Sequence, residues 1–246
     1  MTRTLALEIA VQDPAGVRIA ADVGAARVEL ASALALGGLT PSAATLELAI
    51  EAAAETGVPE VHVLIRPRAG GFHYDADELA VSERDVRRAI DAGAEGVVIG
   101  ALDADGRLDV VAMARLRDAA GGASVTLHRA IDMTADPVAT LRTARELGLR
   151  RVLTSGGASA AIDGIDTLRA LVAAAEGQIE VMAGSGVDAA SAPALALTGV
   201  DAIHFSAKRS VIATGGVRMG SASDGVGGYE VTDRDTALAV CAALGR

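Results

Sequence analysis

The sequence predicts an α/β fold, and within that class one (β/α)8 TIM barrel that spans residues 1–246 as a single domain. The length of 246 residues is typical of such a barrel. Eight short apolar runs alternate with segments of helical pattern, and no linker-like stretch interrupts them. The approaches to strands two, four, six and eight resemble one another, each following a helix end closed by glycine. An open, doubly wound sheet is the alternative.

The first half of the chain contains four predicted strand–helix units. Its strands are expected at the apolar runs 5–10, 26–30, 61–65 and 96–100. Its helices are expected at residues 14–23, 41–55, 77–91 and 109–120. Pro14 and Pro41 suit the first position of a helix, and Asp13 and Thr40 precede them as predicted caps. Gly57 is expected to end the second helix.

The second half continues the alternation. Its strands are expected at residues 125–128, 151–154, 179–183 and 202–205. Its helices are expected at residues 137–147, 159–176, 188–197 and 233–244. Residues 209–228 are rich in Gly and Ser, so an irregular or mobile segment is predicted before the C-terminal helix.

Composition and charge restrict the class of protein. Apolar residues make up 51% of the chain but aromatic residues only 2%, so the core must be packed with Ala, Val, Leu and Ile. The net charge of −10 argues against nucleic acid or an anionic membrane surface as a partner. Cys241 is the only cysteine, which excludes an internal disulfide and fits a reducing compartment. With no secretory signal and no apolar run of about 18 residues, we expect a cytoplasmic protein.

Charged and polar side chains stand at the C-terminal ends of the predicted strands. Because side chains alternate along a strand, the small or polar set is expected to face the inside of the barrel. The residues expected to meet at the C-terminal mouth are Glu8, Glu29, Arg66, His128, Thr154 and Ser206. In strand six this choice places Leu153 on the helix side. The structural alternative is an ion-pair network of Glu8 and Glu29 with Arg66 and Arg27.

Glycine-rich loops after strands six, seven and eight are a second signal. Barrels often offer backbone N–H groups to a phosphate in this region, and glycine allows close approach. We therefore predict a small anionic ligand, although each loop could equally be a tight turn. The residues predicted to bind it are Arg66, Arg129, Thr154, Ser155, Gly156, Gly184, Gly186 and Ser206.

His128 is the predicted catalytic histidine. It could act as a general acid or base whose pKa is set by Glu8 or Glu29, which makes these three the predicted catalytic residues. It could also be a metal ligand together with those carboxylates. His62 and His204 are expected nearer the strand starts or middles. No His-x-x-His or Cys-x-x-Cys spacing occurs, so the metal ligands stay unassigned.

These same stretches resemble the CutC family of copper homeostasis proteins. Among the matches are Arg-Pro-Arg-Ala-Gly-Gly-Phe at 66–72 and His-Arg-Ala-Ile-Asp-Met at 128–133. The matching stretches are 7–9, 27–30, 37–42, 65–72, 128–133, 152–156, 182–187 and 204–207. The resemblance implies a TIM barrel, a cytoplasmic location, a homo-oligomer and a link to copper.

The chain departs from the family at its cysteines. Where members often carry cysteine, this sequence has Ala10, Val11, Ala31 and His73. Copper(I) prefers thiolate and thioether ligands, so a thiolate copper site at these positions is impossible. Two interpretations follow. One is a copper-homeostasis protein that binds the metal or affects its tolerance indirectly. The other is an enzyme that acts by acid/base chemistry on a small anionic or phosphorylated metabolite.

Overall fold

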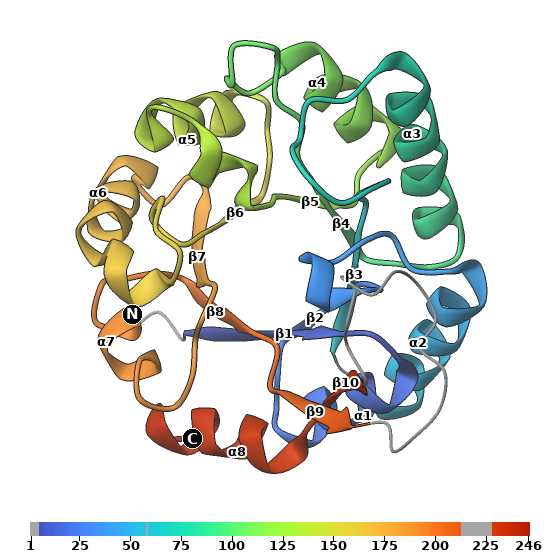
Figure 1. Ribbon diagram of the computed structural model, residues 1–246, viewed down its shortest axis with the longest axis vertical. Coiled ribbons are helices and arrows are strands. Elements are labelled where there is room, and N and C mark those ends of the chain that lie inside the picture. Colours follow the sequence, from blue (N-terminus) through green and yellow to red (C-terminus); the bar gives the residue numbers. More distant parts are fainter. Residues whose placement is uncertain (1–4, 58, 213–227) are drawn as a thin grey trace.

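The chain folds into eight parallel strands that close into a barrel, with helices around the outside (Figure 1). The computed structural model describes residues 5–57, 59–212 and 228–246. The barrel strands are β1 (Ala6–Val11), β2 (Arg27–Leu30), β3 (Glu60–Leu64), β4 (Gly96–Ile99), β5 (Ser124–Leu127), β6 (Arg151–Thr154), β7 (Glu180–Gly184) and β8 (Ala202–Phe205). Because β8 pairs with β1, the predicted TIM barrel is confirmed and the open-sheet alternative is wrong.

Helices follow the barrel strands in turn. They are α1 (Pro14–Asp22), α2 (Ala43–Thr56), α3 (Ala76–Asp91), α4 (Val110–Ala119), α5 (Pro137–Glu146), α6 (Ile165–Ala175), α7 (Ala192–Ala196) and α8 (Arg234–Ala243). Aspartate begins many of them because its carboxylate accepts a backbone N–H of the first turn. The aspartate caps are Asp13, Asp75, Asp109, Asp136 and Asp233. Among the described residues, no helix combines the length and apolar character needed to cross a bilayer.

Three helix starts differ from the prediction, one of them α7, which was expected from residue 188 but begins at Ala192. Ser42, not Thr40, caps α2, since its hydroxyl accepts the N–H of Thr45. Thr40 instead accepts the N–H of Arg66 at 2.9 Å, which joins the loop after β2 to the end of β3. The helix predicted from residue 159 begins later, at Ile165, after the 3-10 turn η3 (Ala161–Gly164). Gly164 is the N-cap of α6 and packs so tightly that a Cβ there would lie 2.0 Å from the carbonyl oxygen of Ser155.

The predicted irregular segment contains strands. β9 (Lys208–Ile212) and β10 (Gly228–Thr232) form an antiparallel pair beside the barrel. The prediction is therefore wrong for residues 209–212 and for residue 228, because cross-strand pairing gives order to a sequence without a strong strand signal. The rest of that segment, residues 213–227, lies outside the described residues.

The inside of the barrel holds two small apolar clusters beside its charged side chains. One consists of Ala31, Leu64 and Val98, and the other of Leu153, Met182 and Ala202. Leu153 thus faces inward and Val152 lies in the outer core, so the predicted orientation of strand six is wrong. Arg151 sets this orientation from inside, where it donates to Glu180 and Thr126. Thr154 consequently faces away from the interior.

Candidate functional site

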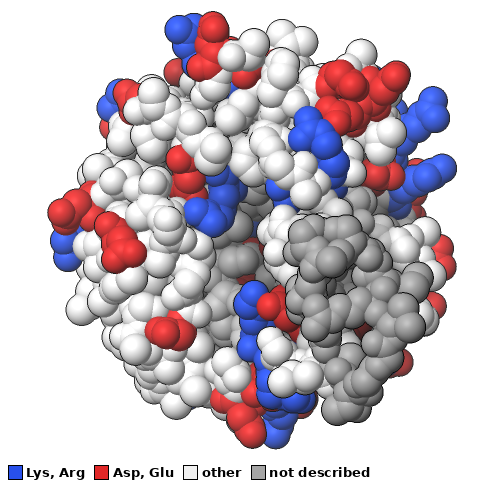
Figure 2. Space-filling view, in the orientation of Figure 1, with Lys and Arg blue, Asp and Glu red and all other residues white. Residues whose placement is uncertain are grey.

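A cavity of about 1020 Å³ opens at the C-terminal mouth of the barrel. Figure 2 shows the hollow near the centre of the face, with Lys or Arg atoms on its rim. Six predicted site residues line it: Glu29, Arg66, His128, Arg129, Gly186 and Ser206. The other five, Glu8, Thr154, Ser155, Gly156 and Gly184, are not among its lining residues. The mouth is thus where the prediction placed it, but nearly half of the predicted residues have other surroundings.

Four ionisable side chains from the neighbouring strands β8, β1 and β2 form a connected series inside the barrel, and two of them, Glu29 and His204, line the cavity. Arg27 donates to Glu8 at 3.0 Å, and the other oxygen of Glu8 lies 2.9 Å from Nδ1 of His204. On its far side, Nε2 of His204 lies 3.7 Å from Glu29. His204 is not among the predicted site residues, although its place on the inward face of strand eight was a usable signal. The structural alternative was correct in pairing Glu8 with Arg27.

Glu8 and Glu29 have different pKa values because their surroundings differ. Burial would raise the pKa of Glu8, but the hydrogen bond to His204 and the charges of His204 and Arg27 hold it well below its usual range. Burial raises the pKa of Glu29 to about 7, with His204 opposing this shift and Glu8 adding to it. Burial disfavours a charge on His204, yet its contacts with Glu8 and Glu29 raise its pKa. At neutral pH, therefore, Glu8 is an ionised structural partner, and Glu29 is poised to exchange a proton.

His128 is a neutral hydrogen-bond donor. Its Nδ1 accepts the backbone N–H of Ala130 at 3.1 Å, which places the ring proton on Nε2. Nε2 is buried and has no hydrogen-bond partner among the described residues. Burial and the charge of Arg66 lower the pKa of His128 to about 3. The ring packs 4.6 Å from that of Phe72 and against Gly100, where a Cβ would lie 2.3 Å from Cε1.

Arg66 organises the loops at the mouth. Its guanidinium donates to the carbonyl oxygens of Leu36, Gly38 and Gly70, at 2.9, 2.8 and 2.9 Å. It also lies over the ring of Phe72, 5.4 Å from the centroid. Because these contacts are with the backbone, Arg66 is not the partner of Glu8 or Glu29 that the structural alternative proposed. It lends positive charge to the cavity wall while tying two loops together.

Arg129 is held by Asp132, a residue that the sequence analysis had not assigned to the site. Nε of Arg129 donates to Asp132 at 2.8 Å. The same carboxylate accepts from the hydroxyl of Thr154 at 2.5 Å, from the hydroxyl and N–H of Ser155, and from the N–H of Gly157. Arg129 keeps 40% of its side chain exposed and lines the cavity. Asp132 therefore fixes an arginine at the mouth.

These bonds change the interpretation of the glycine loops. The donors of Thr154 and Ser155 are used within the protein, and the N–H of Gly156 donates to the hydroxyl of Thr154 at 2.9 Å. Gly184 is needed for packing, since a Cβ would lie 2.6 Å from Leu153. The loop after β6 is thus a closed turn, whereas Gly186 and Ser206 do reach the cavity.

Among the described residues, the sulfur ligands that copper(I) prefers are not assembled at the mouth. Cys241 is buried on α8, and burial raises the pKa of its thiol. The sulfur of Met182 lies 3.9 Å from the guanidinium of Arg27, and Met133 is 65% exposed. Across residues 5–57, 59–212 and 228–246, no group of three or more His, Cys, Asp or Glu is arranged to hold a metal ion. The donor set does not fit a copper(I) site.

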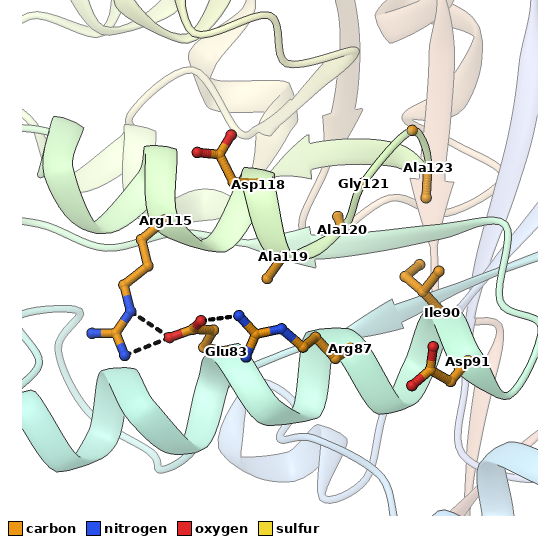
Figure 3. A pocket seen from close by; sticks show the side chains of 11 residues that line it. Glu83, Arg87, Ile90, Asp91, Arg115, Asp118, Ala119, Ala120, Gly121 and Ala123 are labelled. Atoms are coloured by element: carbon orange, nitrogen blue, oxygen red, sulfur yellow. Dashed lines mark hydrogen bonds and ion pairs between the residues drawn. The ribbon is translucent and has the colours of Figure 1, made fainter.

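A second hollow, of about 770 Å³, lies between α3 and α4 near the loop that leads into β5. In Figure 3, Arg87 and Arg115 both point toward Glu83, which accepts hydrogen bonds from each. These exposed charges satisfy one another, and the hollow lies at the N-terminal end of the barrel, away from the usual location of barrel sites. The mouth remains the candidate site.

Comparisons with known proteins agree with the barrel fold. The CutC family profile matches residues 5–209. A CutC family protein of Xanthomonas campestris pv. campestris (strain B100) is 44% identical over 230 residues, 93% of this chain and 94% of that protein. One from Sinorhizobium medicae is 48% identical over 197 residues, 79% of this chain and 77% of that protein.

Solved structures show the same barrel. A CutC protein from Streptococcus agalactiae that is named for copper homeostasis superposes with a TM-score of 0.75 at 30% identity, over 82% of this chain and 98% of that one. Thiamine phosphate pyrophosphorylase from Pyrococcus furiosus has a TM-score of 0.62 at 16% identity, over 99% of this chain and 96% of that one. This second likeness shows the fold alone.

Proposed function

Because this chain belongs to the CutC family, we propose that it serves copper homeostasis indirectly, as an enzyme acting on a small anionic metabolite. The cavity at the barrel mouth binds this metabolite, and Glu29 exchanges a proton with it. In this proposal copper is not held by the mouth, since its donors are nitrogen and oxygen rather than sulfur. The family resemblance also leads us to place the protein in the cytoplasm and to expect a homo-oligomer.

The observation that carries the proposal is the set of donors and cations around one cavity in an acidic chain. Arg66, Arg129 and Lys208 line it, and so does His204, whose contacts with Glu8 and Glu29 raise its pKa and favour its charged form. The acids of the lining are Glu29, Asp188 and Asp235. Arg129 pairs with Asp132 and Lys208 with Glu230, whereas Arg66 forms no ion pair among the described residues and bonds to carbonyl oxygens, so its charge is available to an anion although the chain carries a net charge of −10. Such a cavity attracts anions.

The first prediction is that a metabolite panel of carboxylates and phosphate esters contains a ligand whose binding needs His128. His128→Asn should keep the fold, because the carboxamide oxygen can replace Nδ1 as acceptor for the N–H of Ala130. It removes the buried Nε2–H, and a hydrogen bond to a charged group contributes about 1.5–3 kcal/mol. We therefore expect the affinity, measured by calorimetry, to fall about 10- to 100-fold.

His73→Asn is the matched control, because His73 bonds to the carbonyl of Leu102 and is not among the cavity residues. Arg66→Ala is unsuitable, since it would release two loops along with the charge. Unchanged affinity in His128→Asn, or a large decrease in melting temperature without loss of affinity, would show that the role of His128 is structural.

The second prediction is that the purified protein binds copper(I) weakly, far below the affinity of a site with several thiolates. The reason is chemical, since Cys241 is buried alone and the cavity offers no thiolate. Competition with a copper(I) chelator measures the affinity. Tight stoichiometric binding that persists in Cys241→Ser would contradict this prediction and would show that Met and His suffice.

A further inference from the structure

We infer that the mouth catalyses enolisation of a small carbonyl compound that also carries a carboxylate or a phosphate. In this assignment Glu29 exchanges the proton on the carbon next to the carbonyl, and Nε2–H of His128 donates to the carbonyl oxygen. The inference rests on the proposed function and specifies its reaction and substrate class.

The first support is the unused donor of His128. A buried N–H without an acceptor is costly unless a ligand supplies one. This one belongs to an imidazole whose other nitrogen is already an acceptor for Ala130, so the ring can offer a hydrogen bond without being protonated. A neutral imidazole that polarises a carbonyl is a known catalytic arrangement. An oxygen that gains negative charge during the reaction is the acceptor that such a donor stabilises most.

The second support is the position of Glu29. It lies on β2, whereas His128 follows β5, and both side chains line the same cavity. Two strands, β3 and β4, separate them around the ring, and the cavity that both line joins them across this gap. His204 approaches Glu29 from β8, which leaves the rest of the carboxyl group to the ligand. The pKa of Glu29, near 7, agrees with this role because both forms are available at neutral pH.

The third support is the apolar wall around these two groups. Leu34, Leu64, Phe72, Leu153 and Phe205 line the cavity. Apolar walls exclude water and strengthen the few polar contacts that remain. They suit a compact carbonyl group better than a sugar, whose many hydroxyls would each need a partner. Arg129, 40% exposed at the mouth, donates to Asp132, Ser185, Ser155 and Ala158, and its remaining N–H and its charge are placed to hold the anionic end of such a molecule.

The chemistry balances without a cofactor. The ionised carboxylate of Glu29 takes a proton from the carbon next to the carbonyl. The electron pair of that C–H bond forms the C=C bond of an enolate, and the carbonyl oxygen takes the negative charge beside Nε2–H of His128. Return of a proton to the same carbon exchanges it with solvent. Where that carbon carries a hydroxyl group, transfer of the hydroxyl proton to the enolate oxygen and delivery of the carbon-bound proton to the former carbonyl carbon move the carbonyl group by one carbon and isomerise the compound. Neither an oxidant nor a reductant is required.

Deuterium wash-in tests the inference without knowledge of the natural substrate. Pyruvate, 2-oxobutanoate and dihydroxyacetone phosphate would each be incubated with the protein in D₂O, and loss of the signal of the proton next to the carbonyl followed by proton NMR. We expect exchange of at least one probe at least ~10 times faster than without protein. Glu29→Gln should lower the enzymatic rate by about 100-fold or more, and His128→Asn by a similar factor.

Glu60→Gln is the matched control, because Glu60 lies on β3 outside the cavity and should leave the rate unchanged. Ligand-observed NMR on the same samples separates the two proposals. Probes that bind without exchanging would overturn the enolisation and leave anion binding intact. If none of the three probes binds and none exchanges, the enolisation and the proposed anion binding would both be overturned. Exchange that survives in Glu29→Gln would also overturn the assignment.

Discussion

Replacing Arg27 by methionine should lower the free energy of unfolding by about 3–5 kcal/mol, because it leaves the carboxylate of Glu8 buried without its arginine. The side chain of Glu8 is fully buried and that of Arg27 is 8% exposed, so water cannot take the place of the missing partner. Methionine keeps much of the apolar volume of the arginine stem. The decrease in the free energy of unfolding therefore measures the contribution of the arginine charge. Urea unfolding at pH 7 gives the value.

Arg18→Met is the control for this experiment. Arg18 pairs with Glu55 at 3.1 Å, but both side chains are more than half exposed, and such a pair contributes less than about 1 kcal/mol. The pKa of Glu8 is lowered in the folded state, so its stabilisation is present above the pKa of the unfolded chain and is lost as the pH falls. The difference between wild type and Arg27→Met should narrow accordingly below about pH 4. Equal losses in the two variants would show that the buried pair adds nothing.

Glu29→Gln should make the protein more stable at pH 8, by about 1–3 kcal/mol, and should bring no such gain at pH 4. The pKa of Glu29 rises from 4.5 to about 7 on folding, mainly through burial. As the pH rises between these values, the unfolded chain releases this proton before the folded chain does, so stability falls with pH. Above pH 7 the full cost of the buried charge is present, and glutamine removes it. Chemical unfolding of both proteins across this pH range measures the difference.

The Glu60→Gln variant is the control, because the pKa of Glu60 is shifted in the opposite direction. The pKa of Glu60 is lowered, chiefly by its contact with His62, so this carboxylate is stabilising above its unfolded pKa. Its glutamine variant should show no gain at pH 8. A loss of stability in Glu29→Gln at pH 8 would mean that Glu29 is a structural ion-pair partner, as the alternative from the sequence held.

Together with the exchange assay, Glu29→Gln distinguishes a structural role of Glu29 from a catalytic one. A residue kept for stability should weaken the fold when it is neutralised. A residue kept for chemistry at the cost of stability should do the reverse and abolish exchange. The buried position of Glu29, opposite His204 and without an arginine partner among the residues that the structure describes, agrees with the second case.

Local properties of the sequence determined the barrel and the place of its mouth. Apolar runs predicted the strands, and Asp13, Pro14 and Gly57 ended or began helices through backbone geometry that depends on near neighbours alone. Alternation along a strand also follows from covalent geometry. It correctly placed Glu8, Glu29 and His128 on the inward face. The orientation of strand six was predicted wrongly, because Thr154 donates to Asp132 instead of facing the inside of the barrel.

The tertiary structure alone decided which of the inward charges become partners. Glu8 meets His204, 196 residues away, only because β8 closes against β1 in a register that places them opposite one another. Arg66 was expected to meet a carboxylate but bonds to loop carbonyls, since the loops after β2 and β3 fold over it. The pKa of a buried group depends on its desolvation and on the charges within a few ångströms, and both are properties of the closed barrel. The sequence therefore located Glu29 and His128, and closure of the barrel made one a carboxyl group that exchanges protons near pH 7 and the other a neutral donor.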